Sequence, residues 1–200
     1  MKQIVIGTKN RDKLKEIRRL LRGLKVQVLS LEDFPHCLDV VEDGKTFEAN
    51  AKKKARVYSR HVRGLALADD SGLMVNALRG KPGVYSARFA GPGCTYADNN
   101  LKLLRVLRSV PDSKRKAKFV CVIAIYDNGR LIQTVRGECR GRIAHEVRGL
   151  NGFGYDPVFI PDGFSKTYAE LSKTQKNKIS HRGRALCAAR QVLEHYLEIA

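Results

Sequence analysis

The chain has 200 residues, of which 43% are apolar, so it is long enough to bury one sizeable core, and we expect a single domain over residues 1–200. Its 38 Lys and Arg residues outnumber its 20 Asp and Glu residues. The resulting formal net charge of +18 predicts attraction to polyanions, either nucleic acid or phosphorylated small molecules.

The N-terminus, the apolar runs and the cysteines indicate a cytoplasmic protein. The segment from Met1 to Gly7 lacks the long apolar stretch of a signal peptide, and the longest apolar run, Phe119 to Tyr126, is far shorter than the roughly 20 residues of a membrane-spanning helix. Because the five cysteines are widely separated and never form a C-x-x-C pair, we expect reduced thiols. They are Cys37, Cys94, Cys121, Cys139 and Cys187.

Residues 1–68 predict three short strands separated by two helices. Apolar runs mark the strands, and apolar residues at helical spacing mark the helices, the second of which Thr46 is expected to cap. In chain order the elements are a strand at Ile4–Ile6, a helix containing Leu14, Ile17 and Leu21, a strand at Val26–Leu29, a helix from Phe47 to His61, and a strand at Leu65–Ala68.

The rest of the chain predicts a loop, two helices and a hairpin. Asn128-Gly129 suits the tight turn of the hairpin, and Ser180 is expected to cap the last helix. In chain order the elements are a loop from Arg79 to Gly93, a helix from Ala97 to Leu107, strands at Phe119–Tyr126 and Leu131–Glu138, and a helix from His181 to Glu198. This pattern indicates a mixed α/β fold.

A polar, basic loop follows the first strand and is the first candidate binding site. A helix N-terminus offers unpaired N–H groups and partial positive charge, so the loop could cradle phosphate. Alternatively, Asn10 simply caps the helix and its basic neighbours are solvated. The loop consists of Thr8, Lys9, Asn10, Arg11, Asp12 and Lys13.

Two adjacent carboxylates, Asp69 and Asp70, follow the third strand and precede Ser71 and Gly72. Because neighbouring side chains of a strand point to opposite faces, we expect only one carboxylate to face a given pocket. There it could hold Mg²⁺ and activate water for hydrolysis of a phosphate ester or anhydride. The alternative is a turn closed by hydrogen bonds from these side chains to the backbone.

Two further segments could bind a nucleotide. In the turn from Gly152 to Pro157, the glycines let the backbone approach a flat ligand that Phe153 could cover. Lys176, His181 and Arg182 lie before and at the start of the last helix, where they could contact phosphates or carbonyl groups. A plain loop and a solvated helix start are the alternatives.

Together these segments resemble the inosine/xanthosine triphosphate pyrophosphatase family. The resemblance extends from about Ile4 to Leu193 and rests on several separated motifs in a fixed order. These motifs are T-x-N-x-x-K, ADDSGL, A-L-x-G-x-P-G-x-Y-S-A-R, NGFGYDPVF and K-x-x-x-SHRG-x-A.

The resemblance implies an enzyme that hydrolyses ITP, dITP and XTP to the nucleoside monophosphate and pyrophosphate with Mg²⁺, which clears deaminated purines from the nucleotide pool. It also implies an α/β fold with a mixed, elongated central sheet, flanking helices and two lobes around a substrate cleft. We therefore expect a nucleoside triphosphate as ligand and a homodimer.

The resemblance also assigns residues to the site. Asp70 matches the catalytic carboxylate and is expected to bind the metal together with Glu42. The expected substrate-binding residues are Thr8, Lys9, Asn10, Arg11, Asp12, Lys13, Lys54, Ser71, Phe153, Gly154, Tyr155, Asp156, Lys176, His181 and Arg182.

The acidic segment departs from the family pattern in one respect. Many relatives have a metal-binding glutamate three residues before a glycine, whereas here Val41 stands at that spacing before Gly44. We expect the neighbouring Glu42 to replace that glutamate as metal ligand, through a one-residue shift of the loop. Alternatively, Asp70 and the substrate phosphates supply most of the ligands.

The net charge alone favours a different class, a nucleic-acid-binding module. The chain has no helix-turn-helix motif, no aromatic RNA-binding strand motif and no zinc knuckle, so we expect no specific nucleic-acid binding. A protein that kept the fold and lost catalysis is disfavoured because Asp70 and the matching cations are all present.

Overall fold

The computed structural model describes residues 2–34, 36 and 39–199, and these form two compact units. Unit 1 comprises Met1–Asp70, Cys121–Gly137 and Arg184–Ala200, and unit 2 comprises Ser71–Val120 and Glu138–Gly183. Within the described part of the chain, Cys94, Cys121, Cys139 and Cys187 are free thiols, as predicted. Cys37 lies outside the described residues.

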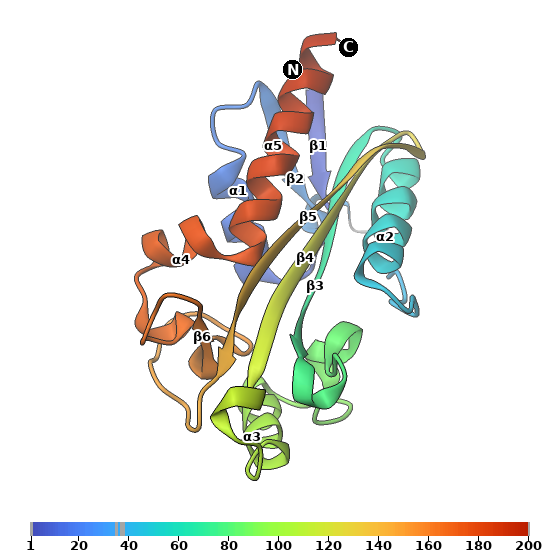
Figure 1. The fold of residues 1–200 in the computed structure, drawn as a ribbon. Helices are drawn as coiled ribbons and strands as arrows, with labels where there is room; N and C mark the ends of the chain where they lie inside the picture. Colours follow the sequence, from blue (N-terminus) through green and yellow to red (C-terminus); the bar gives the residue numbers. More distant parts are fainter. Residues whose placement is uncertain (1, 35, 37–38, 200) are drawn as a thin grey trace. The chain divides into compact units, whose positions relative to one another are not determined.

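A six-stranded sheet has the strand order β2-β1-β3-β4-β5-β6 (Figure 1). β1 pairs in parallel with β2 and with β3, whereas β5 and β6 are antiparallel, so the sheet is mixed, as expected. The strands are β1 (Lys2–Ile6), β2 (Val26–Ser30), β3 (Leu65–Val75), β4 (Lys116–Asp127), β5 (Arg130–Ile143) and β6 (Phe159–Pro161).

Five α-helices accompany the strands in the described residues, which confirms the α/β prediction. Polar side chains fix several helix starts: Thr46 accepts a hydrogen bond from the Ala49 N–H, and Thr95 forms a capping box with Asp98. The helices are α1 (Arg11–Leu20), α2 (Phe47–His61), α3 (Tyr96–Val106), α4 (Lys173–Ile179) and α5 (His181–Ile199). No helix of the described chain is long and apolar enough to cross a membrane.

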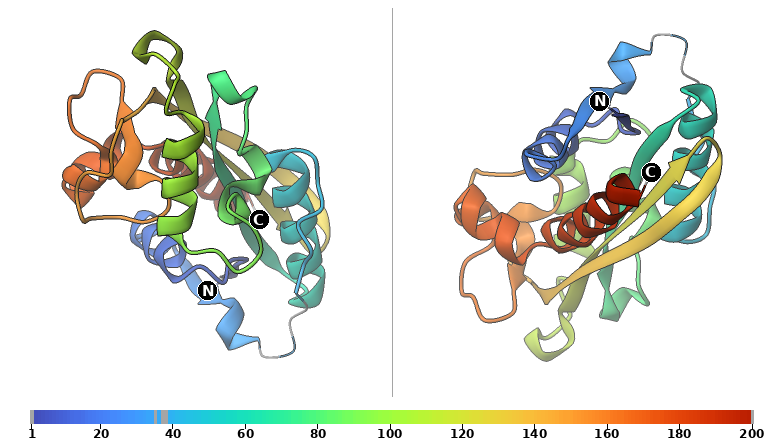
Figure 2. Two further views of the ribbon diagram at one scale, coloured as in Figure 1. Left: turned by 90° about the horizontal axis from the view of Figure 1, so that it is seen from below. Right: turned by 90° about the horizontal axis from the view of Figure 1, so that it is seen from above.

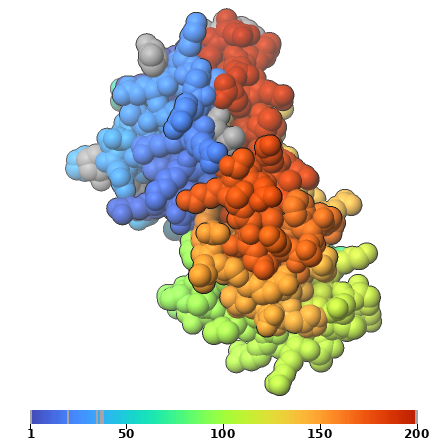
Figure 3. All heavy atoms as spheres, turned by 90° about the vertical axis from the view of Figure 1, so that its left-hand side faces the viewer, coloured from blue at the N-terminus to red at the C-terminus, as the bar shows by residue number. Residues whose placement is uncertain are grey.

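The core of unit 1 joins its first helix, its last helix and the sheet. Ile6, Ile17, Ile123 and Leu186 are fully buried there. Figure 1 shows β1 running beside the end of α5, where Lys2 Nζ lies over the Tyr196 ring. In Figure 2, α5, in red, and α2, in cyan, lie on opposite sides of the long hairpin strands, and in Figure 3 the N-terminal residues, in blue, lie next to α5. Alternate residues of β4, namely Cys121, Ile123 and Ile125, and apolar residues at helical spacing on α1 and α5 form this apolar layer.

The core of unit 2 is rich in aromatic side chains. Phe119 packs edge-to-face on Phe159 and stacks on Tyr168. The guanidinium of Arg115, also buried, donates hydrogen bonds to the carbonyl oxygens of Leu107, Ile143 and Ala144 at 2.7–2.9 Å. Its charge-bearing groups are therefore satisfied by backbone, as burial requires.

The structure differs from the sequence prediction mainly in how long the strands are. β3 does not end before the Asp pair but continues to Val75, so both carboxylates lie inside a strand. The hairpin turn is as predicted, with positive φ at Asn128 and Gly129, although β5 extends to Ile143. The loop from Arg79 to Gly93 contains a short 3-10 helix, and β6 and α4 were not predicted.

A close approach at Gly7, directly after β1, excludes any side chain. A Cβ there would lie 2.8 Å from Cε2 of the buried Tyr58 ring and 3.0 Å from the Cβ of Ala68. We expect Gly7→Ala to lower the free energy of unfolding by about 1–3 kcal/mol because the ring must move. Urea unfolding measures the loss, and Gly64→Ala, whose nearest neighbour would be 3.8 Å away, is the control. Equal losses in both variants would contradict the packing argument.

Candidate functional site

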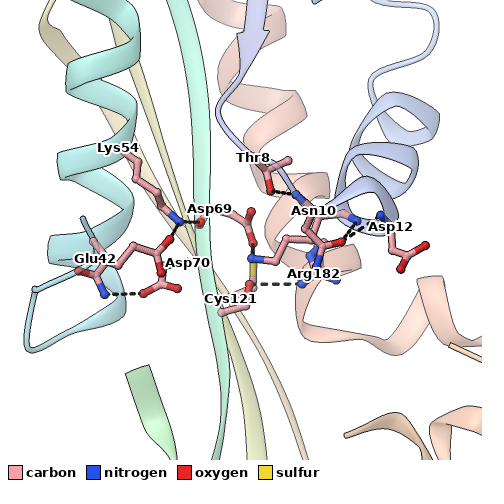
Figure 4. A network of polar contacts seen from close by, with 12 residues as sticks. Thr8, Asn10, Asp12, Glu42, Lys54, Asp69, Asp70, Cys121 and Arg182 are labelled. Carbon is pink, nitrogen blue, oxygen red and sulfur yellow. Dashed lines mark hydrogen bonds and ion pairs between the residues drawn. The ribbon is translucent and has the colours of Figure 1, made fainter. Parts of the chain in front are cut away.

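Asp69 and Asp70 point to opposite sides of β3, as the sequence predicted (Figure 4). Both are buried, with exposed fractions of 1% and 5%. Asp69 faces the side of α1 and Asp70 the side of α2. The strand therefore separates the two carboxylates into two different polar environments within unit 1.

Asp70 is held by the amide of Asn50, whose Nδ2 donates to Asp70 Oδ2 at 2.9 Å. Burial raises the pKa of Asp70 to about 6, the positive charge of Lys54 and the Asn50 hydrogen bond oppose that rise, and the charge of Glu42 adds to it. A carboxylate with such a pKa is mostly ionised at pH 7 and can accept a proton near neutral pH.

Lys54, on the same helix as Asn50, is the cation beside Asp70. Its ammonium contacts the carboxylate of Glu42 and donates to the carbonyl oxygen of Asp69 at 2.6 Å. Burial on its own would lower the pKa of Lys54, but the charges of Asp69, Glu42 and Asp70 raise it overall, so the group stays charged. Asn50 and Lys54 are four residues apart and therefore share one face of α2.

Asp69 forms a buried ion pair with Lys13, whose Nζ lies 2.9 Å from Asp69 Oδ2. The thiol of Cys121, on β4, lies 4.0 Å from the same oxygen. Lys13 belongs to the first turn of α1, so this pair ties the candidate phosphate loop to β3. The position of Asp69 is consistent with the expectation that only one of the two carboxylates faces a given pocket.

The loop before α1 has the capping arrangement that the sequence left as an alternative. Asn10 Oδ1 accepts hydrogen bonds from the N–H groups of Asp12 and Lys13 at 3.0 and 3.1 Å. Thr8 Oγ1 accepts from the Asn10 N–H at 3.2 Å. Lys9 and Arg11 are instead exposed and pair with Asp39 and Glu32. Lys13 is the cation of this loop that reaches the buried carboxylates.

Glu42, rather than Val41, lies beside Lys54 and Asp70. Val41 is 69% exposed, whereas the Glu42 carboxylate contacts the Lys54 ammonium. No group of three or more His, Cys, Asp or Glu side chains in the described residues could hold a metal ion. Two carboxylates nevertheless fit Mg²⁺, which is commonly held by one or two carboxylates together with substrate phosphates and water.

The aromatic turn of unit 2 is organised by Asp156. Its Oδ2 accepts from the Phe153 N–H at 2.8 Å and lies 2.5 Å from Lys176 Nζ. Asp156 is 3% exposed, so this is a buried ion pair. Gly152 has a φ of +81°, and a Cβ there would strike the Asp156 carboxylate, which explains the glycine.

Cations lie over the ring of Phe153, also within unit 2. Lys176 Nζ is 4.9 Å and the Arg182 guanidinium 5.4 Å from the ring centroid. Arg182 also donates to Ser71 Oγ at 3.4 Å. His181 stacks on Phe119, with ring centroids 4.5 Å apart. The arrangement offers a flat aromatic face together with donors, which suits a planar ligand that carries carbonyl groups.

The structure thus gathers the predicted residues into two groups. Thr8–Lys13, Glu42, Lys54 and Asp70 belong to unit 1, and Ser71, Phe153–Asp156, Lys176, His181 and Arg182 belong to unit 2.

Sequence reasoning missed two asparagines that hold these groups in place. Asn50 bonds Asp70, and Asn100 Nδ2 donates to the Gly154 carbonyl oxygen at 2.9 Å. The four-residue spacing of Asn50 and Lys54 was a signal available for the first; none marked the second.

Comparisons with known proteins agree over nearly the whole chain. Residues 4–192 match the model of the Ham1 family. The chain is 52% identical over 187 residues to the dITP/XTP pyrophosphatase of Geobacter sulfurreducens, covering 93% of this chain and 94% of that protein. It is 49% identical over 191 residues to the dITP/XTP pyrophosphatase of Desulforamulus reducens, covering 96% and 95%. A solved structure of a HAM1 protein from Coxiella burnetii has a TM-score of 0.91 and 42% identity, covering 98% and 100%.

The raised pKa of Asp70 predicts a pH-dependent effect of its replacement. Since the folded protein binds the Asp70 proton more tightly than the unfolded chain, ionisation costs stability as pH rises from 3.8 through about 6. In Asp70→Asn the cost is absent, so the free energy of unfolding should rise relative to wild type by about 2–3 kcal/mol more at pH 7 than at pH 4. Urea unfolding with EDTA at both pH values measures this.

Asp98→Asn is the matched control for that measurement. Hydrogen bonds from Thr95 lower the pKa of Asp98, so its carboxylate stabilises the folded protein above pH 4. Its replacement should therefore lose more stability at pH 7 than at pH 4. The same sign of pH dependence in both variants would contradict the burial argument for Asp70.

Proposed function

The chain belongs to the Ham1 family, and from that membership we propose that it hydrolyses non-standard purine nucleoside triphosphates, such as dITP, ITP and XTP, to the nucleoside monophosphate and pyrophosphate. The relatives that carry the name dITP/XTP pyrophosphatase are about half identical to it over more than nine-tenths of their length. The physiological role would be the removal of deaminated purines from the nucleotide pool, by a homodimer in the cytoplasm.

The observation that carries the proposal is the environment of Asp70. A buried carboxylate with a pKa of about 6 is held in place by Asn50 and lies beside Lys54 and Glu42. Asp70 orients a water molecule and takes its proton as the water attacks the α-phosphorus. The bond from the α-phosphorus to the bridging oxygen breaks, and pyrophosphate leaves with that oxygen. Positioning and charge stabilisation account for most of such catalysis.

Mg²⁺ is proposed as the cofactor, with Glu42 and Asp70 as its protein ligands. When bound, it would offset negative charge on the phosphates and polarise the phosphorus–oxygen bonds. Lys13, in the capped first turn of α1, and Lys54, on α2, supply further positive charge in unit 1. A triphosphate carries several negative charges, so a site of this composition favours it over an uncharged nucleoside.

Selectivity for the base is proposed to reside in unit 2. Phe153 provides the flat face, and Lys176 and Arg182 bring donors to it. Hypoxanthine and xanthine accept hydrogen bonds at C6, whereas adenine donates there. A donor that faces the adenine amino group is left unpaired, at a cost of about 1–3 kcal/mol.

Pyrophosphate release from ITP, dITP, XTP, ATP and GTP, with Mg²⁺ and with EDTA, tests the proposal. We expect turnover of the first three substrates, little turnover of ATP, and loss of activity in EDTA. GTP also has a carbonyl at C6, so its rate shows whether the site discriminates at C2 as well. Equal rates with ATP and ITP would contradict the substrate assignment, and full activity in EDTA would contradict the metal assignment.

The different positions of the two carboxylates predict different effects of their replacement. Asp70→Asn should remove nearly all turnover while the protein stays folded, because the amide keeps the volume but cannot accept the proton. Asp69→Asn leaves Lys13 without its buried partner and should mainly lower stability, by about 3–5 kcal/mol. Initial rates and urea unfolding of both variants measure this. Equal loss of turnover in two folded variants would assign the carboxylates one shared role.

Arg182 is predicted to act in base discrimination. Arg182→Ala should lower kcat/KM for ITP and XTP by about one to two powers of ten, because only the keto substrates lose a charged donor worth about 1.5–3 kcal/mol. The low ATP rate should change little. Lys178→Ala, which removes an exposed cation from α4, is the control and should leave both substrates unaffected. If kcat/KM falls by the same factor for ITP and for ATP, Arg182 binds phosphate instead.

A further inference from the structure

Lys54 lies close to three acidic side chains of unit 1, Asp69, Glu42 and Asp70. Lys54 is 7% exposed, and its ammonium contacts the Glu42 carboxylate and donates to the Asp69 carbonyl oxygen at 2.6 Å. The charge of Asp70 acts on it as well. Lys13 is engaged by Asp69, on the other side of β3. Lys54 is therefore the cation on the side of β3 where Glu42 and Asp70 lie, although the charge of Lys13 also acts on Asp70.

The charges of this group do not balance in the absence of ligand. Two carboxylates, Glu42 and Asp70, share one ammonium, so the group carries about one negative charge when both acids are ionised. A divalent cation on the two carboxylates would neutralise them by itself. The buried ammonium would then have lost its anionic partners, which is costly unless a new anion replaces them.

Resting on the function proposed above, we propose that Lys54 is a resident counter-ion that weakens binding of a divalent cation to Glu42 and Asp70 until a phosphate anion draws the ammonium away. The metal and the nucleotide are then bound cooperatively. The phosphate gives the displaced ammonium a new anionic partner, and the metal neutralises the carboxylates that the ammonium leaves. Lys54 is in this sense a positioning residue for Glu42 as well as a phosphate ligand.

The local structure suits such an exchange. Glu42 lies in the irregular segment before α2 and its side chain is about one-third exposed, whereas Asp70 is fixed on β3 by Asn50. Lysine has a flexible stem and a compact charge, so its ammonium can change partners without movement of the helix. The Lys54 contact with Glu42 is the interaction that must be exchanged.

Binding of Mn²⁺ alone, followed by the electron paramagnetic resonance signal of the free ion, tests this without turnover. In the absence of nucleotide, Lys54→Met should bind Mn²⁺ at least tenfold more tightly than wild type. Lys53→Met is the matched control, since it removes one charge from the neighbouring residue of α2, whose partly exposed side chain pairs with Asp43 at 2.7 Å. It should change the Kd less than threefold. Equal tightening in both variants would show a general effect of net charge and overturn the proposal.

Two further variants keep the test decisive. Lys54→Arg retains the charge and should bind Mn²⁺ as weakly as wild type. Adding Glu42→Gln to Lys54→Met should abolish the gain. If Lys54→Met does not fold, Lys54→Gln takes its place. A folded, neutral variant with the Mn²⁺ affinity of wild type overturns the proposal.

Inorganic tripolyphosphate tests the cooperativity. After correction for the complex that it forms with Mn²⁺ in solution, it should tighten Mn²⁺ binding more than tenfold in wild type and less than threefold in Lys54→Met. Equal tightening would overturn the proposal. A failure of the proposed function appears separately, as absence of pyrophosphate release from ITP, dITP and XTP.

Discussion

Two neighbouring carboxylates buried in one strand impose the constraint on which unit 1 depends. Because β3 directs Asp69 and Asp70 to opposite faces, each buried carboxylate has a cation on its own side of the strand. Lys13 from α1 meets Asp69, and Lys54 from α2 meets the side of Asp70. The two helices are thus held to the strand by charge as well as by apolar contacts. One carboxylate consequently becomes a structural anchor, which leaves the other available for chemistry.

Unit 2 also contains a buried carboxylate that is paired with a lysine. Asp156 accepts the Phe153 N–H and pairs with Lys176, so a buried carboxylate again fixes the conformation of a backbone segment. Asn100 donates to the Gly154 carbonyl oxygen, and the Tyr155 hydroxyl donates to the backbone carbonyl oxygen of Ser86. The aromatic turn is therefore held from several elements. Such a turn is pre-organised for a ligand, so little order has to be gained on binding.

Local signals predicted the local features of this fold well. The Asn10 and Thr46 caps, the Asn128-Gly129 turn and the start of the last helix at His181 each depend on a few adjacent residues. The end of β3 was predicted wrongly because two carboxylates in succession resemble a turn, and the cations that allow their burial lie far away in the sequence. The separate roles of Asp69 and Asp70 followed from strand geometry, whereas the Asn50 and Asn100 contacts depend on tertiary packing that no short pattern encodes.

The side-chain amide of Asn50 connects two segments at once. Its Nδ2 donates to Asp70, and its Oδ1 accepts the Gly44 N–H at 2.7 Å. A Cβ on residue 44 would lie 2.5 Å from that oxygen, so a glycine is required there. Because the amide bonds both Asp70 and the Gly44 backbone, it fixes the position of Gly44 relative to β3. The position of Glu42, two residues before Gly44, is restricted as a result. Transplanting this acidic segment into another scaffold would therefore require the span from Glu42 to Asn50 to be moved intact, because an insertion of one residue would break the link between the glutamate and the strand.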